Sequence, residues 1–200
     1  CAIRVGFLSR LLAGTSTGGI IALALAHGAT LDEAIDIYKN NGDKIFKKEG
    51  FSAWRWLKSL FVETYSDTGI LQELRTVLGE KTTLGDLKKD VVVTSYDLQG
   101  GSTGIPGPYV FNSRKEEFKT VKLWQAGRAT SAAPTYFDPY YGFAGRSLID
   151  GGVIFNHPGH VALDEISALH PHDERDEIVS NIDMLSFGTG VFYRLCCKKS

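Results

Sequence analysis

A serine flanked by glycines near the start of the chain has a setting that could support catalysis. Gly14-Thr15-Ser16-Thr17-Gly18 satisfies the G-x-S-x-G pattern of a nucleophile elbow, in which a strand turns sharply into a helix. Glycine at the crowded positions of such a turn avoids a side-chain clash. The turn presents the serine hydroxyl at the sheet's edge and aims the first helical amides at a reacting carbonyl. The pattern therefore predicts that Ser16 is the nucleophile of an acyl hydrolase.

The glycines of this pattern have two other interpretations. A glycine-rich helix start without chemistry would produce the same short pattern. The apolar residues before Gly14 and the helical run at 20–25 favour the elbow, because both flanking elements are then present. A phosphate-binding loop is disfavoured because no lysine follows the glycines.

A serine hydroxyl needs a neighbouring base, and the chain offers two kinds. His157 or His160, with Asp150, would meet the order serine, acid, histidine of α/β-hydrolases. These histidines follow the acid by only seven and ten residues, which is too close for a separate loop at a strand end. Asp150 itself follows an apolar run directly, so we expect it at the C-terminal end of a strand, where open α/β sheets place their sites.

The residues after Asp150 favour it as the base. Gly151 and Gly152 let the backbone turn tightly and leave room for a hydroxyl to approach. A plain Asp-Gly turn without chemistry is the alternative, since such turns are common.

Segments of strand and helix character alternate along the chain. Apolar and β-branched runs predict strands at 7–13, 91–93, 109–111, 147–149 and 182–187, and helical spacing predicts helices at 18–26, 67–78, 121–131 and 161–169. Thr30 and Glu33 form a predicted capping box at the start of a further helix. This alternation indicates one α/β layered domain with a largely parallel sheet.

Composition narrows the classes of partner and setting. The chain has 22 Lys plus Arg against 23 Asp plus Glu, and no basic cluster interleaved with aromatic residues, so no nucleic-acid partner is expected. The apolar stretch at 5–26 is interrupted by the glycine pattern, which leaves halves too short to cross a bilayer. Cysteines occur only at positions 1, 196 and 197, which favours a reduced, cytoplasmic setting. Cys196 and Cys197 are read as part of an exposed tail, with a palmitoylation site as the alternative.

Four segments, in order, resemble the motifs of patatin-like phospholipases. They are G-T-S-T-G-G at 14–19, A-T-S-A-A-P-T-Y-F at 129–137, L-I-D-G-G-V at 148–153 and L-S-F-G-T-G at 185–190. Asn156-His157-Pro158 stands where the family usually has N-N-P. The segments cover most of the chain, and four motifs in the expected order make a chance match implausible.

The resemblance implies an α/β fold, specifically a three-layer α/β/α sandwich with a mainly parallel sheet. It implies a Ser–Asp dyad without a catalytic histidine, in which Ser16 carries the acyl group and Asp150 takes its proton and later activates water. The implied substrates are glycerolipids and phospholipids, cleaved at acyl esters without a metal or cofactor. The supporting residues are Gly14, Thr17, Gly18 and Gly19 for the elbow and oxyanion site, and Gly151 and Gly152 beside the acid.

One motif of the family has no match in the sequence. Its members carry a D-G-G-G-x-R-G loop upstream of the elbow, whose amides form the oxyanion hole, but only thirteen residues precede Gly14 here. We therefore expect residues 1–200 to form a single, N-terminally incomplete patatin-like domain. Because one oxyanion donor is worth about 100–1,000-fold in turnover, a catalytically impaired lipid-binding or regulatory module is the alternative to an active hydrolase.

Aromatic and basic residues are concentrated between positions 47 and 61. The apolar residues are Phe51, Trp54, Trp56, Leu57, Leu60 and Phe61, and the cations are Lys47, Lys48, Arg55 and Lys58. Such a segment can lie at a membrane interface, which would make the protein peripheral to membranes. The favoured interpretation is that these aromatic residues cover the sheet, because large apolar side chains are usually core.

Overall fold

The computed structural model describes residues 11–34, 67–168, 170–172, 174, 175, 177 and 182–188. The predictions for the aromatic and basic segment at 47–61, and for Cys1, Cys196 and Cys197, lie outside these residues. Within the described ranges, none of the helices has the length and apolar character needed to cross a bilayer.

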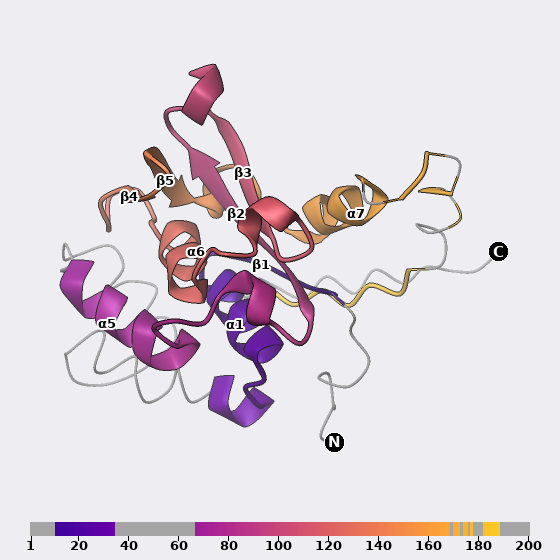
Figure 1. Cartoon of the computed structure of the whole chain (residues 1–200), viewed down its shortest axis with the longest axis horizontal. Helices are drawn as coiled ribbons and strands as arrows, with labels where there is room; N and C mark the ends of the chain where they lie inside the picture. The colour runs from indigo at the N-terminus through magenta and orange to yellow at the C-terminus, as the bar shows by residue number, and fades with distance from the viewer. Residues whose placement is uncertain are drawn as a thin grey trace.

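Strand β2 (Asp90–Asp97) is the centre of the sheet formed by the described residues (Figure 1). Its run Val91-Val92-Val93 is fully buried, as the β-branched sequence predicts for a strand covered on both faces. Strand β1 (Leu11–Thr15) pairs with it in parallel, and β3 (Gly107–Asn112) and β5 (Arg146–Asp150) pair with it antiparallel. Strand β4 (Tyr140–Phe143) extends the sheet beyond β5.

The pairing register places β1 and β5 on the same edge of β2. β1 pairs with residues 90–94 and β5 with residues 95–97, whereas β3 pairs with residues 92–97 and so overlaps both. Because one strand edge pairs with one neighbour at a time, β3 occupies one edge, and β1 and β5 follow each other along the other. Thr15 lies opposite Thr94 and Asp150 lies opposite Ser95. The C-terminal ends of β1 and β5 therefore meet.

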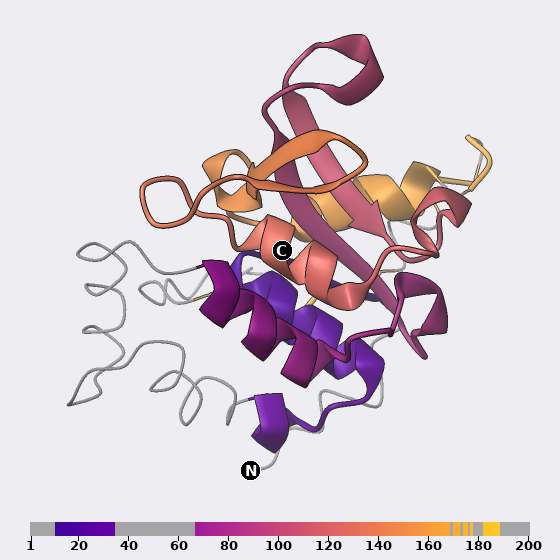
Figure 2. The ribbon, with the colours of Figure 1, turned by 60° about the vertical axis from the view of Figure 1, so that its left-hand side comes forward.

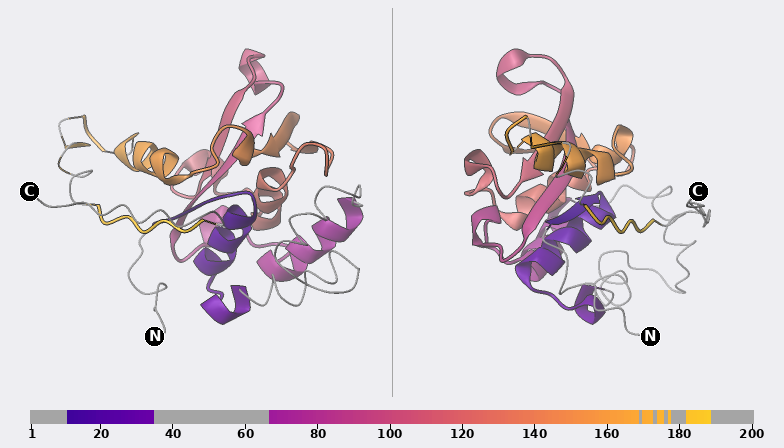
Figure 3. Two further views of the ribbon diagram at one scale, coloured as in Figure 1. Left: turned by 180° about the vertical axis from the view of Figure 1, so that it is seen from behind. Right: turned by 90° about the vertical axis from the view of Figure 1, so that its right-hand side faces the viewer.

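Helices cover both faces of the sheet. Helices α1 (Thr17–His27) and α6 (Leu123–Thr130) pack against β2, and α5 (Asp67–Leu78) packs on them from outside. Helix α7 (Gly159–Ala168) lies on the other side, as Figures 2 and 3 show. There the amide of Asn112 on β3 donates a hydrogen bond of 2.8 Å to Glu165 of α7. The three layers and the α/β class are thus those expected.

Helix α1 ends where the sequence predicts. Gly28 follows it with a left-handed φ of 116°, and its N–H donates to the carbonyls of Ala24 and Leu25. The next helical turn begins with the predicted capping box, because the Thr30 N–H donates to Glu33 at 2.7 Å and the Glu33 N–H donates to the Thr30 hydroxyl at 3.2 Å.

Two predictions about strands need correction. The sheet is mixed, with one parallel and three antiparallel pairings among the described strands, because short connections join β2 to β3 and β4 to β5 as hairpins. The strand predicted at 182–187 is not a strand in the structure. An apolar run becomes a strand only where a neighbouring strand accepts and donates its backbone hydrogen bonds, and local sequence does not specify that neighbour.

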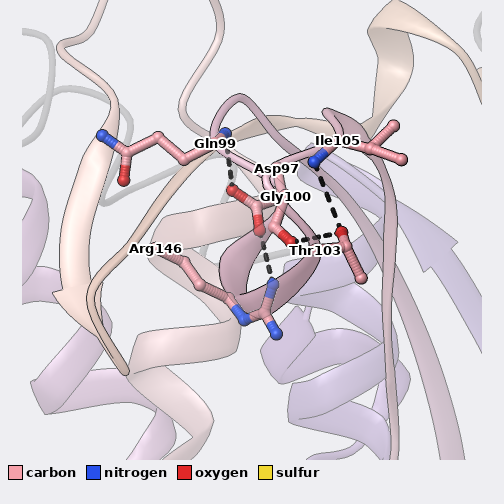
Figure 4. Close-up of polar contacts among 6 residues, drawn as sticks. All are labelled: Asp97, Gln99, Gly100, Thr103, Ile105 and Arg146. Carbon is pink, nitrogen blue, oxygen red and sulfur yellow. Dashed lines mark hydrogen bonds and ion pairs between the residues drawn. The ribbon is translucent and has the colours of Figure 1, made fainter.

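An ion pair joins β2 and β5 at the end of their ladder opposite Asp150 (Figure 4). The guanidinium of Arg146, at the start of β5, donates to the Asp97 carboxylate at 2.5 Å. The backbone N–H of Gln99 donates to the same carboxylate at 3.0 Å. Burial alone would raise the pKa of Asp97, but the hydrogen bonds from Gln99 and Arg146 and the guanidinium charge hold that pKa below its usual value. The guanidinium also lies 4.5 Å from the centre of the Tyr109 ring. These contacts tie both strands together at one end of their short ladder.

The turn from β1 into α1 requires glycine at one of its two flanking positions. A Cβ atom on Gly14 would lie 2.2 Å from the carbonyl oxygen of Gly18, so the strand and the helix cross in direct backbone contact. A Cβ atom on Gly18 would meet no described atom within 4 Å. The clash expected at both glycines is therefore real at Gly14 only.

This difference predicts that alanine at Gly14 and alanine at Gly18 affect the free energy of unfolding differently. Gly14→Ala is expected to lower the free energy of unfolding by about 2–4 kcal/mol, because the clash is with backbone that cannot rotate away. Gly18→Ala is expected to leave it unchanged or raise it by up to about 1 kcal/mol, since alanine favours a helix more than glycine does. Urea unfolding followed by circular dichroism measures both. Equal losses in the two variants would contradict the crossing described above.

Candidate active site

Ser16 lies between β1 and α1 with a positive φ of 56°, in the left-handed half of the Ramachandran plot, and a ψ of −129°. Such a conformation costs a non-glycine residue about 1–3 kcal/mol and is found mainly where surrounding contacts enforce it. The contacts here are on both sides of the residue. Its N–H donates to the hydroxyl oxygen of Thr130 at 2.8 Å, and its carbonyl accepts the N–H groups of Gly19 and Ile20 at 2.9 and 3.2 Å. This is the strained turn that the G-x-S-x-G pattern predicts.

Asp150 is the last residue of β5 and is 6% exposed. Its Oδ2 accepts the hydroxyl of Ser16 at 2.5 Å, and its Oδ1 accepts the backbone N–H of Gly152 at 2.7 Å. Its own N–H donates to the carbonyl of Ala132 at 2.9 Å. The two residues predicted as nucleophile and base are thus in direct contact, and both oxygens of the carboxylate are oriented.

The surroundings of Asp150 make its carboxylate a better base. Burial raises the pKa of Asp150, because the charged form loses hydration. The hydrogen bonds from Ser16 and Gly152 act in the opposite direction, and burial prevails. A base with a raised pKa accepts a hydroxyl proton more readily, which is the tuning that a Ser–Asp pair requires.

The predicted glycines have different roles in the structure. A Cβ atom on Gly151 would lie 2.4 Å from the Thr94 hydroxyl oxygen, so glycine is required there for the close approach to β2. Gly19 donates its N–H to the Ser16 carbonyl, and a Cβ atom on it would lie 2.9 Å from the Thr130 methyl group. Gly19 therefore belongs to the elbow's packing, and its amide is not available to an oxyanion.

Thr17 is the first residue of α1 and directly follows Ser16. The oxyanion donor of an elbow comes from the residue after the nucleophile, and the first N–H groups of a helix have no partner within the helix. Thr17 therefore lies in the first helical turn, one residue before the helix that the sequence predicts at 18–26.

The histidines contact other groups. His157 Nε2 lies 3.1 Å from the Ser186 hydroxyl, and its Nδ1 accepts the N–H of Gly159 at 3.3 Å. The ring centres of His157 and His160 lie 5.8 Å apart with the rings tilted by 52°, and His27 ends α1. Among the described residues, the hydroxyl of Ser16 is therefore bonded to an aspartate and not to a histidine, which favours the dyad over the triad.

Buried hydroxyl groups around the pair were not predicted from the sequence. The Thr15 hydroxyl lies 2.7 Å from that of Thr94 and donates to the carbonyl of Phe155, five residues after Asp150, also at 2.7 Å. The Ser95 hydroxyl donates to the Ile149 carbonyl at 2.6 Å. The sequence does contain a signal for them, because hydroxyl residues interrupt the apolar strand β2. Such residues need hydrogen-bond partners inside the protein.

The described residues contain no cluster of three or more histidine, cysteine or acidic side chains placed to hold a metal ion.

Comparisons with known proteins show which proteins this chain resembles. The chain is 32% identical over 195 residues to a cGAMP-activated phospholipase of Vibrio cholerae, covering 93% of this chain and 54% of that protein. It is 32% identical to patatin-like protein 1 of Oryza sativa subsp. indica, covering 90% of this chain and 48% of that protein. It is 29% identical to the mouse (Mus musculus) 85/88 kDa calcium-independent phospholipase A2, covering 90% of this chain and 21% of that protein.

The chain thus spans about half the length, or less, of these relatives. The sequence model of the patatin-like phospholipase family matches residues 3–163, which include both Ser16 and Asp150. The chain therefore belongs to the patatin-like phospholipase family.

Proposed function

We propose that this chain hydrolyses acyl esters of glycerolipids or phospholipids through Ser16 and Asp150. The observation that carries the proposal is the 2.5 Å hydrogen bond from the Ser16 hydroxyl to Oδ2 of a buried aspartate. Family membership supports lipid acyl hydrolysis in general, and the names of the relatives describe phospholipases.

The first half of the proposed reaction forms an acyl-enzyme. The Oγ of Ser16 attacks the ester carbonyl carbon as its proton passes to Oδ2 of Asp150. The carbonyl oxygen becomes an oxyanion near the N-terminus of α1, where the helix dipole favours negative charge. When the carbonyl re-forms, the ester C–O bond breaks and the leaving alcohol takes the proton from Asp150. Ser16 then carries the acyl group.

The second half releases the fatty acid. Water attacks the acyl-enzyme carbonyl and gives a proton to Asp150, which returns it to the Oγ of Ser16 as that oxygen leaves. Asp150 thus serves as base and acid in turn, and a raised pKa suits both roles. Because the proposed substrates gather in bilayers and micelles, the proposal includes peripheral contact with a lipid surface.

The competing hypothesis is a lipid-binding or regulatory module with impaired turnover. The hydrogen bond between the Ser16 hydroxyl and the Asp150 carboxylate favours an active enzyme over this module. Covalent labelling of Ser16 by a fluorophosphonate probe, together with turnover of a phospholipid, separates the two hypotheses. An impaired module would bind lipid vesicles without turning over their phospholipids.

Substitution of either member of the pair is expected to remove the activity. Ser16→Ala and Asp150→Asn should each lower the rate of hydrolysis of a short-chain p-nitrophenyl ester by about 1,000-fold or more, because they remove the nucleophile and its base. His157→Ala and His160→Ala are the matched controls and should retain most of the activity. A histidine variant as inactive as Ser16→Ala would replace the dyad by a triad.

The pKa of Asp150 predicts how activity depends on pH. The ionised carboxylate is the active base, so kcat/KM should fall as the pH drops through the raised pKa, at a higher pH than for an ordinary aspartate. A pH–rate profile measures this midpoint. A midpoint at about 4, the ordinary value, would show that burial does not tune this carboxylate.

The same pKa makes a prediction about stability. A raised pKa means that the folded protein prefers neutral Asp150, so stability is lost as the pH rises from the ordinary aspartate value through the folded value. Asp150→Asn should therefore be more stable than the wild type at neutral pH, and the advantage should shrink as the pH is lowered toward about 4. Thermal unfolding at several pH values tests this. An Asn variant less stable at neutral pH would contradict it.

A further inference from the structure

We propose that Thr130 is a positioning residue for the nucleophile. Its side-chain oxygen accepts the N–H of Ser16 and keeps Ser16 in the left-handed conformation that brings Oγ to Asp150. This inference rests on the proposed function, because it concerns how the same Ser–Asp pair is held ready for reaction.

The contact is inside the protein and connects distant parts of the chain. Thr130 is the last residue of α6, is 0% exposed, and lies 114 residues from Ser16 in sequence. The distance from the Ser16 nitrogen to Thr130 Oγ1 is 2.8 Å. Because Thr130 is fully buried, water could not easily take the place of its side-chain oxygen. A substitution that removes this oxygen would therefore leave the N–H of Ser16 without its hydrogen-bond acceptor.

The contact controls the direction of the Ser16 side chain. Rotation about φ of Ser16 swings Cβ and Oγ relative to the peptide group that carries the Ser16 N–H. Thr130 holds this N–H, and helix α1 holds the Ser16 carbonyl through Gly19 and Ile20. With both flanking peptide groups held, the left-handed φ cannot relax, and Oγ stays at 2.5 Å from Asp150.

The end of α6 holds both members of the pair. Thr130 accepts the N–H of Ser16 through its side chain, and Ala132, two residues later, accepts the N–H of Asp150 through its carbonyl at 2.9 Å. Thr130 and Ala132 therefore contact the backbone of the nucleophile and of the base directly. These two contacts hold Ser16 and Asp150 to the same helix end, although Ser16 lies 114 residues before Thr130 in sequence.

Thr130→Ser and Thr130→Ala form the deciding pair of variants. Both lose the methyl group that packs beside Gly19, and only the serine keeps the oxygen. For Thr130→Ala we expect kcat, and the rate of fluorophosphonate labelling of Ser16, to fall about 10- to 100-fold with little change in KM, as loss of a buried hydrogen bond in the transition state would produce. Thr130→Ser should stay within about threefold of the wild type.

Ser131→Ala is the matched control at the same helix end. The Ser131 hydroxyl is also buried, but it donates to the carbonyl of Gly127 at 2.8 Å, with the Arg128 carbonyl at 3.4 Å, and not toward the elbow. This variant should lose stability as Thr130→Ala does, measured by melting temperature, while keeping the wild-type kcat. The comparison separates positioning of the nucleophile from general loosening of α6.

Wild type and Ser16→Ala are measured first. Absence of any Ser16-dependent hydrolysis or labelling would overturn the proposed function and this inference with it. If the wild type is active but Thr130→Ala keeps the wild-type kcat, the inference alone is overturned. The same follows if Ser131→Ala loses as much kcat as Thr130→Ala, or if a folded Thr130→Ser variant has a kcat as low as that of Thr130→Ala. If Thr130→Ala does not fold, Thr130→Val replaces it, and failure of both to fold would assign Thr130 to stability and overturn its positioning role.

Discussion

Two strands of opposite direction end against each other on one edge of β2, and the candidate site depends on this meeting. β1 runs parallel to β2 as far as Thr94, and β5 runs antiparallel to it as far as Ser95. The residue after β1 is Ser16, and the last residue of β5 is Asp150. Because β1 and β5 end opposite adjacent residues of β2, the side chains of Ser16 and Asp150 lie next to each other. The hydrogen bond between them follows from the sheet's register. The Asp97–Arg146 pair holds that register at the other end of the short β2–β5 ladder.

Several hydrogen bonds offset the conformational strain of the Ser16 backbone and oppose its relaxation. A left-handed serine costs about 1–3 kcal/mol, and each buried hydrogen bond that holds it contributes about 0.5–1.5 kcal/mol. Bonds to Thr130 on one side and to α1 on the other are together of the same size as the strain. The Thr15 hydroxyl adds a link from β1 to Phe155, beyond the acid. Under the proposed function, Ser16 is thus held in place before substrate arrives, which lowers the cost of reaching the transition state.

Asp97 and Asp150 are both buried in the sheet, but their pKa values are shifted in opposite directions because their partners differ. Asp97 meets a guanidinium, so the pKa of Asp97 is held low and the group stays charged as a structural anchor. Asp150 meets a hydroxyl and one amide, which do not offset its lost hydration, so the pKa of Asp150 is raised. Among the described residues no cation contacts Asp150, and its raised pKa suits it to accept a proton from the Ser16 hydroxyl.

The sequence by itself determined the nucleophile pattern, the acid with its glycines, the four long helices and the buried strand β2. These features depend on neighbours a few residues apart, through periodicity, capping and tight turns. Only the tertiary structure decided that Gly14 and not Gly18 is sterically required, that the sheet is mixed, and that Thr130 accepts the Ser16 N–H. It also brought Asp150 to Ser16 across 134 residues of sequence. Strand edges and backbone hydrogen bonds choose their partners from the whole chain, so local sequence cannot specify them.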